Sequence, residues 1–258
     1  MMQSSILTAI LCTEKIEKIS GGGLILYIKS TIRAGINEEL TKCEFEESLW
    51  CNVELEHQRL LVGLCYRCPT SIGVNDDKLL HMMEKAVLQT RTHHVLVMGD
   101  FNYPEIDYKW EVVAAGDTDP PTLFFNKTQE LCRFQHISDA TRVRQNQTPT
   151  ILHYVFTDQG NLIDSVVYKA PLGKSDHMVL RWELSLATLQ LKSLKFFLIL
   201  IIMKMTIIVS SRDVRNRFKF RFGFSSVLEK NSDSVRNEFG SVRFAKTRFG
   251  SDSYLLLM

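Results

Sequence analysis

Strand-like and helix-like segments alternate along residues 1–187, and this alternation predicts a mixed α/β fold. Short apolar runs that contain β-branched residues are typical of strands, and two longer amphipathic segments are typical of helices. A polar break between two neighbouring apolar runs is typical of a hairpin. Because hairpins accompany the alternation, we expect a mixed α/β sandwich rather than a purely parallel sheet.

The expected strands are apolar runs bounded by turn-forming residues. The first follows three glycines in Gly21–Ser30. Ser48–Pro69 holds two more, separated by the polar residues Glu56–Arg59, which suggests a hairpin. The remaining strands are expected at His94–Asp100, Ile151–Thr157, Ile163–Pro171 and Asp176–Leu184.

Two amphipathic helices are expected to flank these strands. Asn75–Thr90 opens with capping residues and continues with apolar residues at helical spacing. The face that these residues form consists of Leu79, Leu80, Met83, Val87 and Leu88. Thr122–Gln135 is the second helix candidate.

Charge divides the chain into a mildly acidic body and a basic tail. The 258 residues carry a net charge of +2, so the chain as a whole gives no signal for nucleic-acid binding. Residues 1–209 hold 21 Lys and Arg against 24 Asp and Glu, whereas residues 210–258 hold 10 against 5. We expect the domain to span residues 1–187, followed by an apolar segment at 188–209 and the tail at 210–258.

The six cysteines and the N-terminus indicate an intracellular protein, nuclear or cytoplasmic. The cysteines lie mostly among apolar neighbours, and no secretory signal precedes them, so we interpret them as reduced thiols. Cys65 and Cys68 form one CxxC pair, but a structural zinc site needs four ligands, and no second pair lies nearby. Packed cysteines are the simpler interpretation.

Two interpretations stay open for each C-terminal segment. Phe196–Val209 is strongly apolar, but fourteen residues reach about 21 Å as a helix, short of the roughly 30 Å hydrocarbon core. A membrane span is therefore unfavoured but remains an alternative. The Phe-, Gly-, Ser- and Arg-rich tail is typical of a disordered or unselected segment, or of one that binds RNA by charge and stacking.

Polar groups that suit phosphate chemistry stand at three strand ends. Asp100 and Asn102 follow an apolar strand directly, with Phe101 pointing the other way to pack. Tyr66 and Arg67 end an earlier strand, and both offer good phosphate donors. Asp176 and His177 begin a late strand and could supply a base and a metal ligand. Taken singly, each group also fits a purely structural role.

The order of these groups carries more information than any one of them. The motifs are "GGGLILYIKS", "LVGLCYRCPTS", "HVLVMGDFNYPEIDY", "TRVRQNQTPTILHYVFT" and "APLGKSDHMVL". In this order they resemble the endonuclease/exonuclease/phosphatase superfamily, which has the DNase-I-like fold. They are most similar to the apurinic-type endonuclease domains of non-LTR, LINE-like retrotransposons. The resemblance covers about residues 20–185 and implies a four-layer sandwich of two sheets flanked by helices.

The resemblance also implies roles for individual residues. Asp100 would orient or activate the attacking water, or protonate the leaving group. Asn102 would donate to the phosphate, and Tyr66 would contact a phosphate oxygen. Asp176 would orient His177 and lie near a Mg²⁺ ion, and His177 would act as a base or stabilise the transition state. The implied partner is DNA.

Two departures from the family pattern bear on activity. Such domains begin with a strand that ends in Asn and another that ends in a metal-binding Glu, both upstream of the glycine turn. Only 20 residues precede Gly21, so we expect the domain to be incomplete at its N-terminus, with Glu14 as the candidate metal ligand. Where the family has an Asp that hydrogen-bonds the catalytic histidine, this chain has His153. A second imidazole should lower the basicity of His177.

The sequence therefore predicts a metal-dependent phosphodiesterase, an endonuclease domain of retrotransposon origin that nicks DNA. One alternative is a catalytically inactive, degenerate fragment of the same family. Another is a protein that associates with RNA or a membrane through its C-terminal segment. The oligomeric state stays open.

Overall fold

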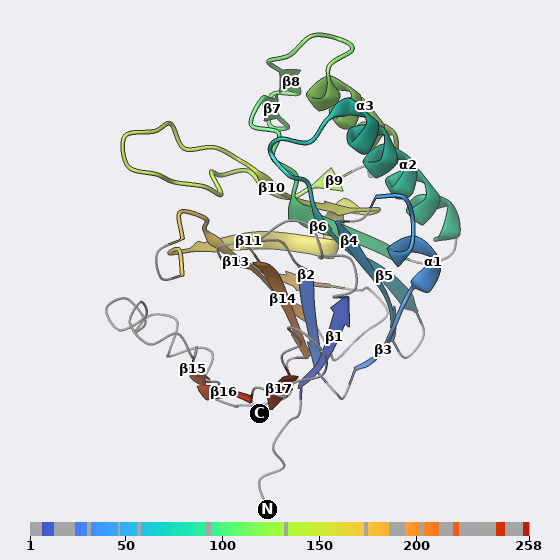
Figure 1. Cartoon of the computed structure of the whole chain (residues 1–258), viewed down its shortest axis with the longest axis vertical. Coiled ribbons are helices and arrows are strands. Elements are labelled where there is room, and N and C mark those ends of the chain that lie inside the picture. Colours follow the sequence, from blue (N-terminus) through green and yellow to red (C-terminus); the bar gives the residue numbers. More distant parts are fainter. Residues whose placement is uncertain are drawn as a thin grey trace, which may run out of the picture.

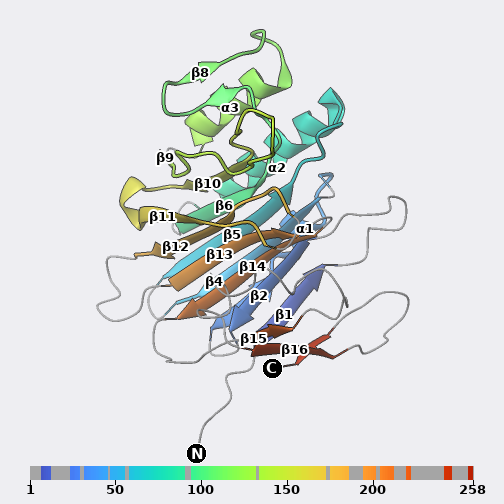
Figure 2. The ribbon, with the colours of Figure 1, turned by 90° about the vertical axis from the view of Figure 1, so that its left-hand side faces the viewer.

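Two six-stranded sheets pack against each other in the computed structural model (Figures 1 and 2). The structure describes residues 7–12, 24–29, 32–45, 47–55, 58–90, 94–131, 134–172, 175–185, 194–201, 204–211, 219–221, 241–245 and 255–257. The first sheet has the order β1-β2-β14-β13-β12-β11. Its strands are β1 Leu7–Cys12, β2 Leu24–Lys29, β11 Ile163–Lys169, β12 Val179–Leu184, β13 Leu194–Ile201 and β14 Lys204–Ser211.

The second sheet has the order β3-β4-β5-β6-β10-β9 and carries most of the expected site residues. Its strands are β3 Arg33–Ile36, β4 Ser48–Glu54, β5 Arg59–Tyr66, β6 His94–Asp100, β9 Phe134–Gln135 and β10 His153–Thr157. β4 and β5 are antiparallel, β5 and β6 are parallel, and β6 and β10 are antiparallel. The hairpin expected within Ser48–Pro69 is confirmed.

Each central strand of the second sheet contributes to two cores because its side chains alternate between the faces. The core between the sheets includes Leu26, Val62, Met98, Val155 and Trp182. The core on the outer face lies under the helices and includes Trp50, Leu79, Met83, Phe101 and Phe124. The helices are α1 Glu38–Thr41, α2 Gly73–Gln89 and α3 Pro120–Leu131, and η1 is a 3₁₀ turn at Gly160–Leu162. The expected α/β fold of two packed sheets flanked by helices is confirmed.

The helices differ from their expected limits and faces. α2 begins at Gly73, two residues before the expected start. Its buried apolar residues are Leu79, Met82, Met83 and Ala86, whereas Leu88 is 56% exposed. These four residues are spaced i, i+3, i+4 and i+7 and so form the helix face that packs against the sheet, whereas Leu88 lies outside that face. α3 ends at Leu131, and Phe134–Gln135, expected within that helix, forms β9 instead.

The apolar C-terminal segment forms strands rather than a helix. β13 and β14 are antiparallel, and they lie between β12 and β2 in the first sheet. No helix among the described residues is long and apolar enough to cross a membrane. The domain limit at residue 187 and the role of the tail stay predictions, and most of residues 212–258 lies outside the described part. The remaining strands are β7 Ile106–Asp107, β8 Val112–Val113, β15 Lys219–Arg221, β16 Ser241–Ala245 and β17 Leu255–Leu257.

Candidate functional site

Three strand ends of the second sheet bring three polar side chains into one row. Asp100 at the end of β6 pairs with Tyr66 of β5 on one side and with His153 of β10 on the other. Leu64 and Met98 lie two residues before Tyr66 and Asp100, Val155 lies two residues after His153, and all three face the core between the sheets. Because side chains two residues apart share a face, Tyr66, Asp100 and His153 extend that core at its edge.

The Gly-Asp-Phe-Asn turn has a structural reason at each position. A Cβ on Gly99 would lie 2.0 Å from the carbonyl oxygen of Cys65, so the close approach of β5 and β6 requires glycine. Phe101 is fully buried, and its ring lies 5.0 Å from that of Phe124, as the expected packing role requires. Asn102 adopts a φ of 52°, a left-handed conformation that asparagine tolerates better than most residues. The turn therefore aims Asp100 and Asn102 while Phe101 anchors them.

Arg67 has the structural role that the sequence left open beside that of a phosphate donor. It is 6% exposed and forms a two-point ion pair with the buried Asp76 of α2, with N–O distances of 2.5 and 3.1 Å. Its backbone N–H donates to the Asp100 carbonyl, and its own carbonyl accepts from the Asn102 Nδ2 at 2.8 Å. The guanidinium also lies 4.1 Å from the centre of the Tyr103 ring. Arg67 thus holds the turn in place, and the Asp76 carboxylate neutralises its charge inside the protein.

Asp176 and His177 approach the row on the segment that leads into β12 of the first sheet. This segment pairs with residues 141–143, since Val143 N–H donates to the Asp176 carbonyl and Met178 N–H donates to the Thr141 carbonyl. The Thr141 hydroxyl accepts hydrogen bonds from the backbone of Leu152 and His153, which fixes the start of β10. The two sheets therefore meet at the site through Thr141.

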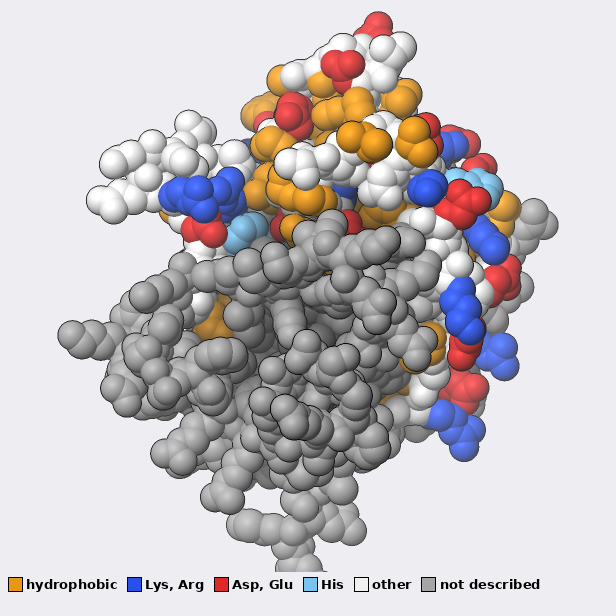
Figure 3. All heavy atoms as spheres, viewed as in Figure 1, with side chains coloured by type: hydrophobic (Ala, Val, Ile, Leu, Met, Phe, Trp, Pro, Cys, Tyr) orange, Lys and Arg blue, Asp and Glu red, His pale blue; other side chains and the backbone are white. Residues whose placement is uncertain are grey.

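Two arginines hold the Asp176 carboxylate. Its Oδ2 accepts from Arg142 Nε at 2.8 Å and from Arg144 Nε at 3.0 Å. These contacts place both guanidinium groups beside the histidines, at the base of a loop that projects from the body (Figure 1). Figure 3 shows basic, acidic and histidine side chains gathered on the surface there. Sequence reasoning did not find Arg142 or Arg144, since their pairing with Asp176 depends on long-range register.

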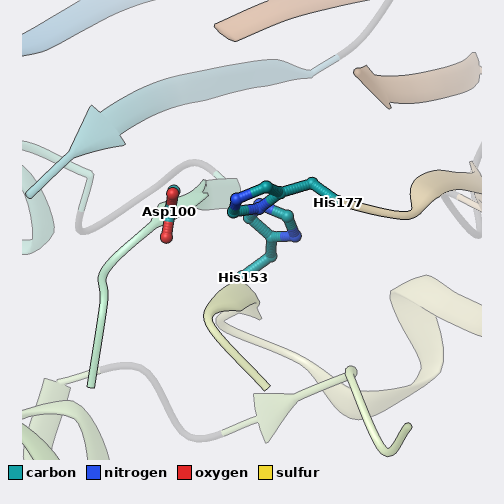
Figure 4. A group of neighbouring side chains, drawn as sticks. All are labelled: Asp100, His153 and His177. Atoms are coloured by element: carbon teal, nitrogen blue, oxygen red, sulfur yellow. The ribbon is translucent and has the colours of Figure 1, made fainter. Parts of the chain in front are cut away.

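His177 and His153 lie in direct contact, as Figure 4 shows. The Nδ1 of His177 lies 3.1 Å from the Nε2 of His153, and the other His177 nitrogen lies 3.7 Å from an Asp176 oxygen. Burial, assisted by His177, lowers the pKa of His153 to about 3. Burial also lowers the pKa of His177, an effect that Asp176 opposes and that Arg142 and Arg144 reinforce. The basicity of His177 therefore falls through burial and the two arginines, and His153, the cause expected from the sequence, is not among the groups that shift it.

Asp100 and Tyr66 have ionisation properties that suit proton transfer and hydrogen-bond donation. Asp100 is 2% exposed, and burial raises its pKa to about 7, although hydrogen bonding from Asn102 opposes this. Its Oδ1 has no hydrogen-bond partner among the described residues. Tyr66 is half-buried, and desolvation raises its pKa to about 12, so its hydroxyl remains a donor near neutral pH. Asp100 can therefore exchange a proton near pH 7, and Tyr66 can donate to an anion.

This arrangement of strands and helices also occurs in a solved nuclease structure. No family model and no curated protein matches the chain. The endonuclease domain of TRAS1, a telomere-specific non-LTR retrotransposon, matches with a TM-score of 0.51 and 13% identity, over 70% of this chain and 81% of that domain. The chain has the DNase-I-like fold.

Two structures of beta toxin from Staphylococcus aureus are less similar. Both have 14% identity, and one is a mutant with bound magnesium ions. Their TM-scores are 0.30 and 0.32, over 51% and 60% of this chain and 54% and 56% of theirs. These values are too low to support an argument. The TRAS1 likeness establishes the DNase-I-like fold alone.

The magnesium ion expected from the sequence does not fit the described donors of this DNase-I-like fold. Mg²⁺ prefers an octahedron of oxygen ligands, chiefly carboxylates, phosphates and water. Asp176, the expected ligand, is engaged by two guanidinium groups, and Glu14 lies outside the described residues. The metal-ligating side chains that do converge are Asp100, His153 and His177, whose ligand atoms all lie within 4.8 Å of one another. Two of these three donors are nitrogens.

Proposed function

We propose that this chain is a phosphodiester-cleaving domain that nicks DNA and derives from a non-LTR retrotransposon. The observation that carries the proposal is the convergence of Tyr66, Asp100 and His177 at one edge of the two sheets. These residues come from three separate strand ends, and packing alone does not require an acid, a phenol and an imidazole at one point. A phosphodiester in the site would meet a donor, a proton-exchanging acid and a base.

Each residue then has a role that follows from its surroundings. Tyr66 donates to a phosphate oxygen, because its hydroxyl stays protonated near neutral pH. Asn102 donates to the same phosphate with the amide hydrogen that otherwise bonds Asp100, while its other amide hydrogen stays on the Arg67 carbonyl. His177, the imidazole of the pair with more access to solvent, accepts the proton of the attacking water or stabilises the transition state. Asp100 orients that water or protonates the leaving oxygen.

Asp176 and the arginines act on this site indirectly. Arg142 and Arg144 hold Asp176 beside the ring of His177, so Asp176 positions that ring. The Arg144 side chain is 52% exposed, and its charge is available to a neighbouring phosphate of the DNA backbone. The Mg²⁺ expected from the sequence enters none of these steps.

Conversion of supercoiled plasmid to the open-circular form tests the proposal. We expect the folded full chain, supplied in turn with Mg²⁺, Mn²⁺ and Zn²⁺, to nick DNA with at least one of them. His177→Gln should abolish nicking, whereas His81→Gln, on an exposed position of α2, should leave it unchanged. Absence of nicking by folded protein with all three metals would refute the proposal.

A second candidate function is that of an inactive member of the same fold. Two observations favour it: an imidazole, His153, stands against His177, and two guanidinium groups neutralise Asp176. Removal of an orienting carboxylate can cost orders of magnitude in rate. This candidate predicts that His153→Asp gains nicking that the natural chain lacks. If both chains are folded and equally inactive, the missing carboxylate is not the reason.

A further inference from the structure

Asp100 and the histidine pair include two buried polar atoms that have no hydrogen-bond partner among the described residues. His153 is 1% exposed and Asp100 is 2% exposed. Neither His153 Nδ1 nor Asp100 Oδ1 has a hydrogen-bond partner within the described part of the chain. A buried polar atom without a partner costs about 1–3 kcal/mol, so the free oxygen of Asp100 beside two imidazoles needs an explanation. A bound cation would supply the missing partner for the carboxylate.

The spacing of the donor atoms suits a small metal ion. In a tetrahedral zinc site with Zn–N bonds of about 2.0–2.1 Å, two ligand nitrogens lie about 3.3–3.4 Å apart. His153 Nε2 and His177 Nδ1 lie 3.1 Å apart, which is close to that edge. The whole group, including Asp100, lies within 4.8 Å, so a small side-chain movement of the carboxylate closes the set around an ion.

The donor types select the class of metal. Two imidazoles and one carboxylate form a set that binds zinc and related divalent ions, with further positions open to water or substrate. Magnesium gains little from imidazole nitrogen and prefers oxygen throughout. Asp176 lies 3.7 Å from the His177 nitrogen that faces away from His153, where a carboxylate can orient a metal-bound imidazole.

We propose that Asp100, His153 and His177 bind a divalent transition metal of the class that Zn²⁺ represents, in place of an oxygen-ligated Mg²⁺. Arg142 and Arg144 hold Asp176 beside the His177 nitrogen that does not face His153, and from there Asp176 orients the His177 ring. The imidazole of His153 creates this preference, because it is the donor that differs from a carboxylate-rich site. With the ion bound, Asp100 and His177 serve as its ligands, so this inference replaces the acid and base roles given to them under the proposed function. Metal binding itself does not depend on nuclease activity, and it is measured without DNA.

Calorimetric titration of the metal-free full chain tests the proposal. We expect one Zn²⁺ per chain, with an affinity at least about 100-fold above that for Mg²⁺. Titration with Co²⁺ should produce visible ligand-field bands of a site with fewer than six ligands. His177→Gln should weaken Zn²⁺ binding at least about 10-fold. Loss of a residue that only orients a metal ligand already costs about 10-fold in affinity, and loss of a ligand should cost no less. Circular dichroism establishes that each variant is folded.

Matched variants separate this site from adventitious binding. His81→Gln removes an exposed histidine and should leave the Zn²⁺ affinity unchanged. Cys43→Ser and Cys68→Ser remove the two thiols that are partly exposed among the described cysteines, and they should also have no effect. His153→Asp replaces a nitrogen by oxygen and should shift the Zn²⁺ to Mg²⁺ affinity ratio towards Mg²⁺ by at least about 10-fold.

Three results would overturn the proposal. The first is no Zn²⁺ binding by the folded natural chain. The second is Zn²⁺ binding that survives His177→Gln but disappears with either cysteine variant. The third is an unchanged Zn²⁺ to Mg²⁺ affinity ratio in folded His153→Asp.

Discussion

The buried ion pair between Arg67 and Asp76 should be one of the costliest contacts to break. Both side chains are at most 7% exposed, and the pair links the end of β5 to α2. Asp76→Ala leaves the guanidinium buried without a counter-charge. Loss of one partner from such a pair typically costs about 3–5 kcal/mol, and the remaining contacts of Arg67 with the Asn102 carbonyl and the Tyr103 ring do not replace a carboxylate.

Urea unfolding of the folded chain measures this cost. Asp77→Ala is the matched control, since Asp77 is the next residue on α2 but is exposed, and it should cost less than about 0.5 kcal/mol. We expect the midpoint for Asp76→Ala to fall with an unchanged slope, which marks a change of stability rather than of compactness. Because Arg67 holds the Asp100–Asn102 turn, DNA nicking should fall as well. A difference of less than about 1 kcal/mol between the two variants would contradict the reasoning.

Three further predictions concern the turn, the pH dependence and the DNA contact. Gly99→Ala forces a Cβ to within 2.0 Å of the Cys65 carbonyl, so β5 and β6 must separate; thermal unfolding should show a lower midpoint. Burial lowers the pKa of His136 to about 4 from an unfolded value near 6.5, so protons bind the unfolded chain first and stability falls from pH 6.5 to 4. His136→Gln should flatten part of that fall in urea titrations at each pH, and an unaltered pH profile would contradict the assignment. Arg144→Gln should reduce the slope of log affinity for duplex DNA against log salt by about 0.9, whereas an unchanged slope would show that Arg144 meets no phosphate.

The sequence contains enough local information to predict the central strands and the turn. Val95, Leu96 and Val97 form an apolar run that ends in Gly99 and Asp100, and both the strand and its end follow from residue type. The packing of Phe101 follows from the alternation of side chains along a strand. These features depend on neighbours in the chain, and therefore the sequence predicts them.

Features that depend on distant partners were not predictable in the same way. The apolar character of residues 196–209 indicates burial, but it does not say that β13 and β14 lie between β2 and β12. Arg142 and Arg144 reach Asp176 across more than 30 residues, through a pairing that only the folded register creates. The position of Arg67 at a strand end is compatible with a phosphate donor and with a structural residue, and only the approach of α2 shows that Asp76 pairs with it.

The central claim, that Asp100 belongs to a site for phosphodiester chemistry, is tested most directly by Asp100→Asn. This change keeps the shape of the side chain and removes a buried carboxylate, one oxygen of which has no hydrogen-bond partner among the described residues. A buried carboxylate that serves catalysis usually costs the folded state some stability. The variant should therefore be as stable as the natural chain or more stable. Its single-turnover rate of plasmid nicking should fall by about 10²–10⁴. A variant that unfolds more easily while it nicks DNA at the natural rate would contradict the account.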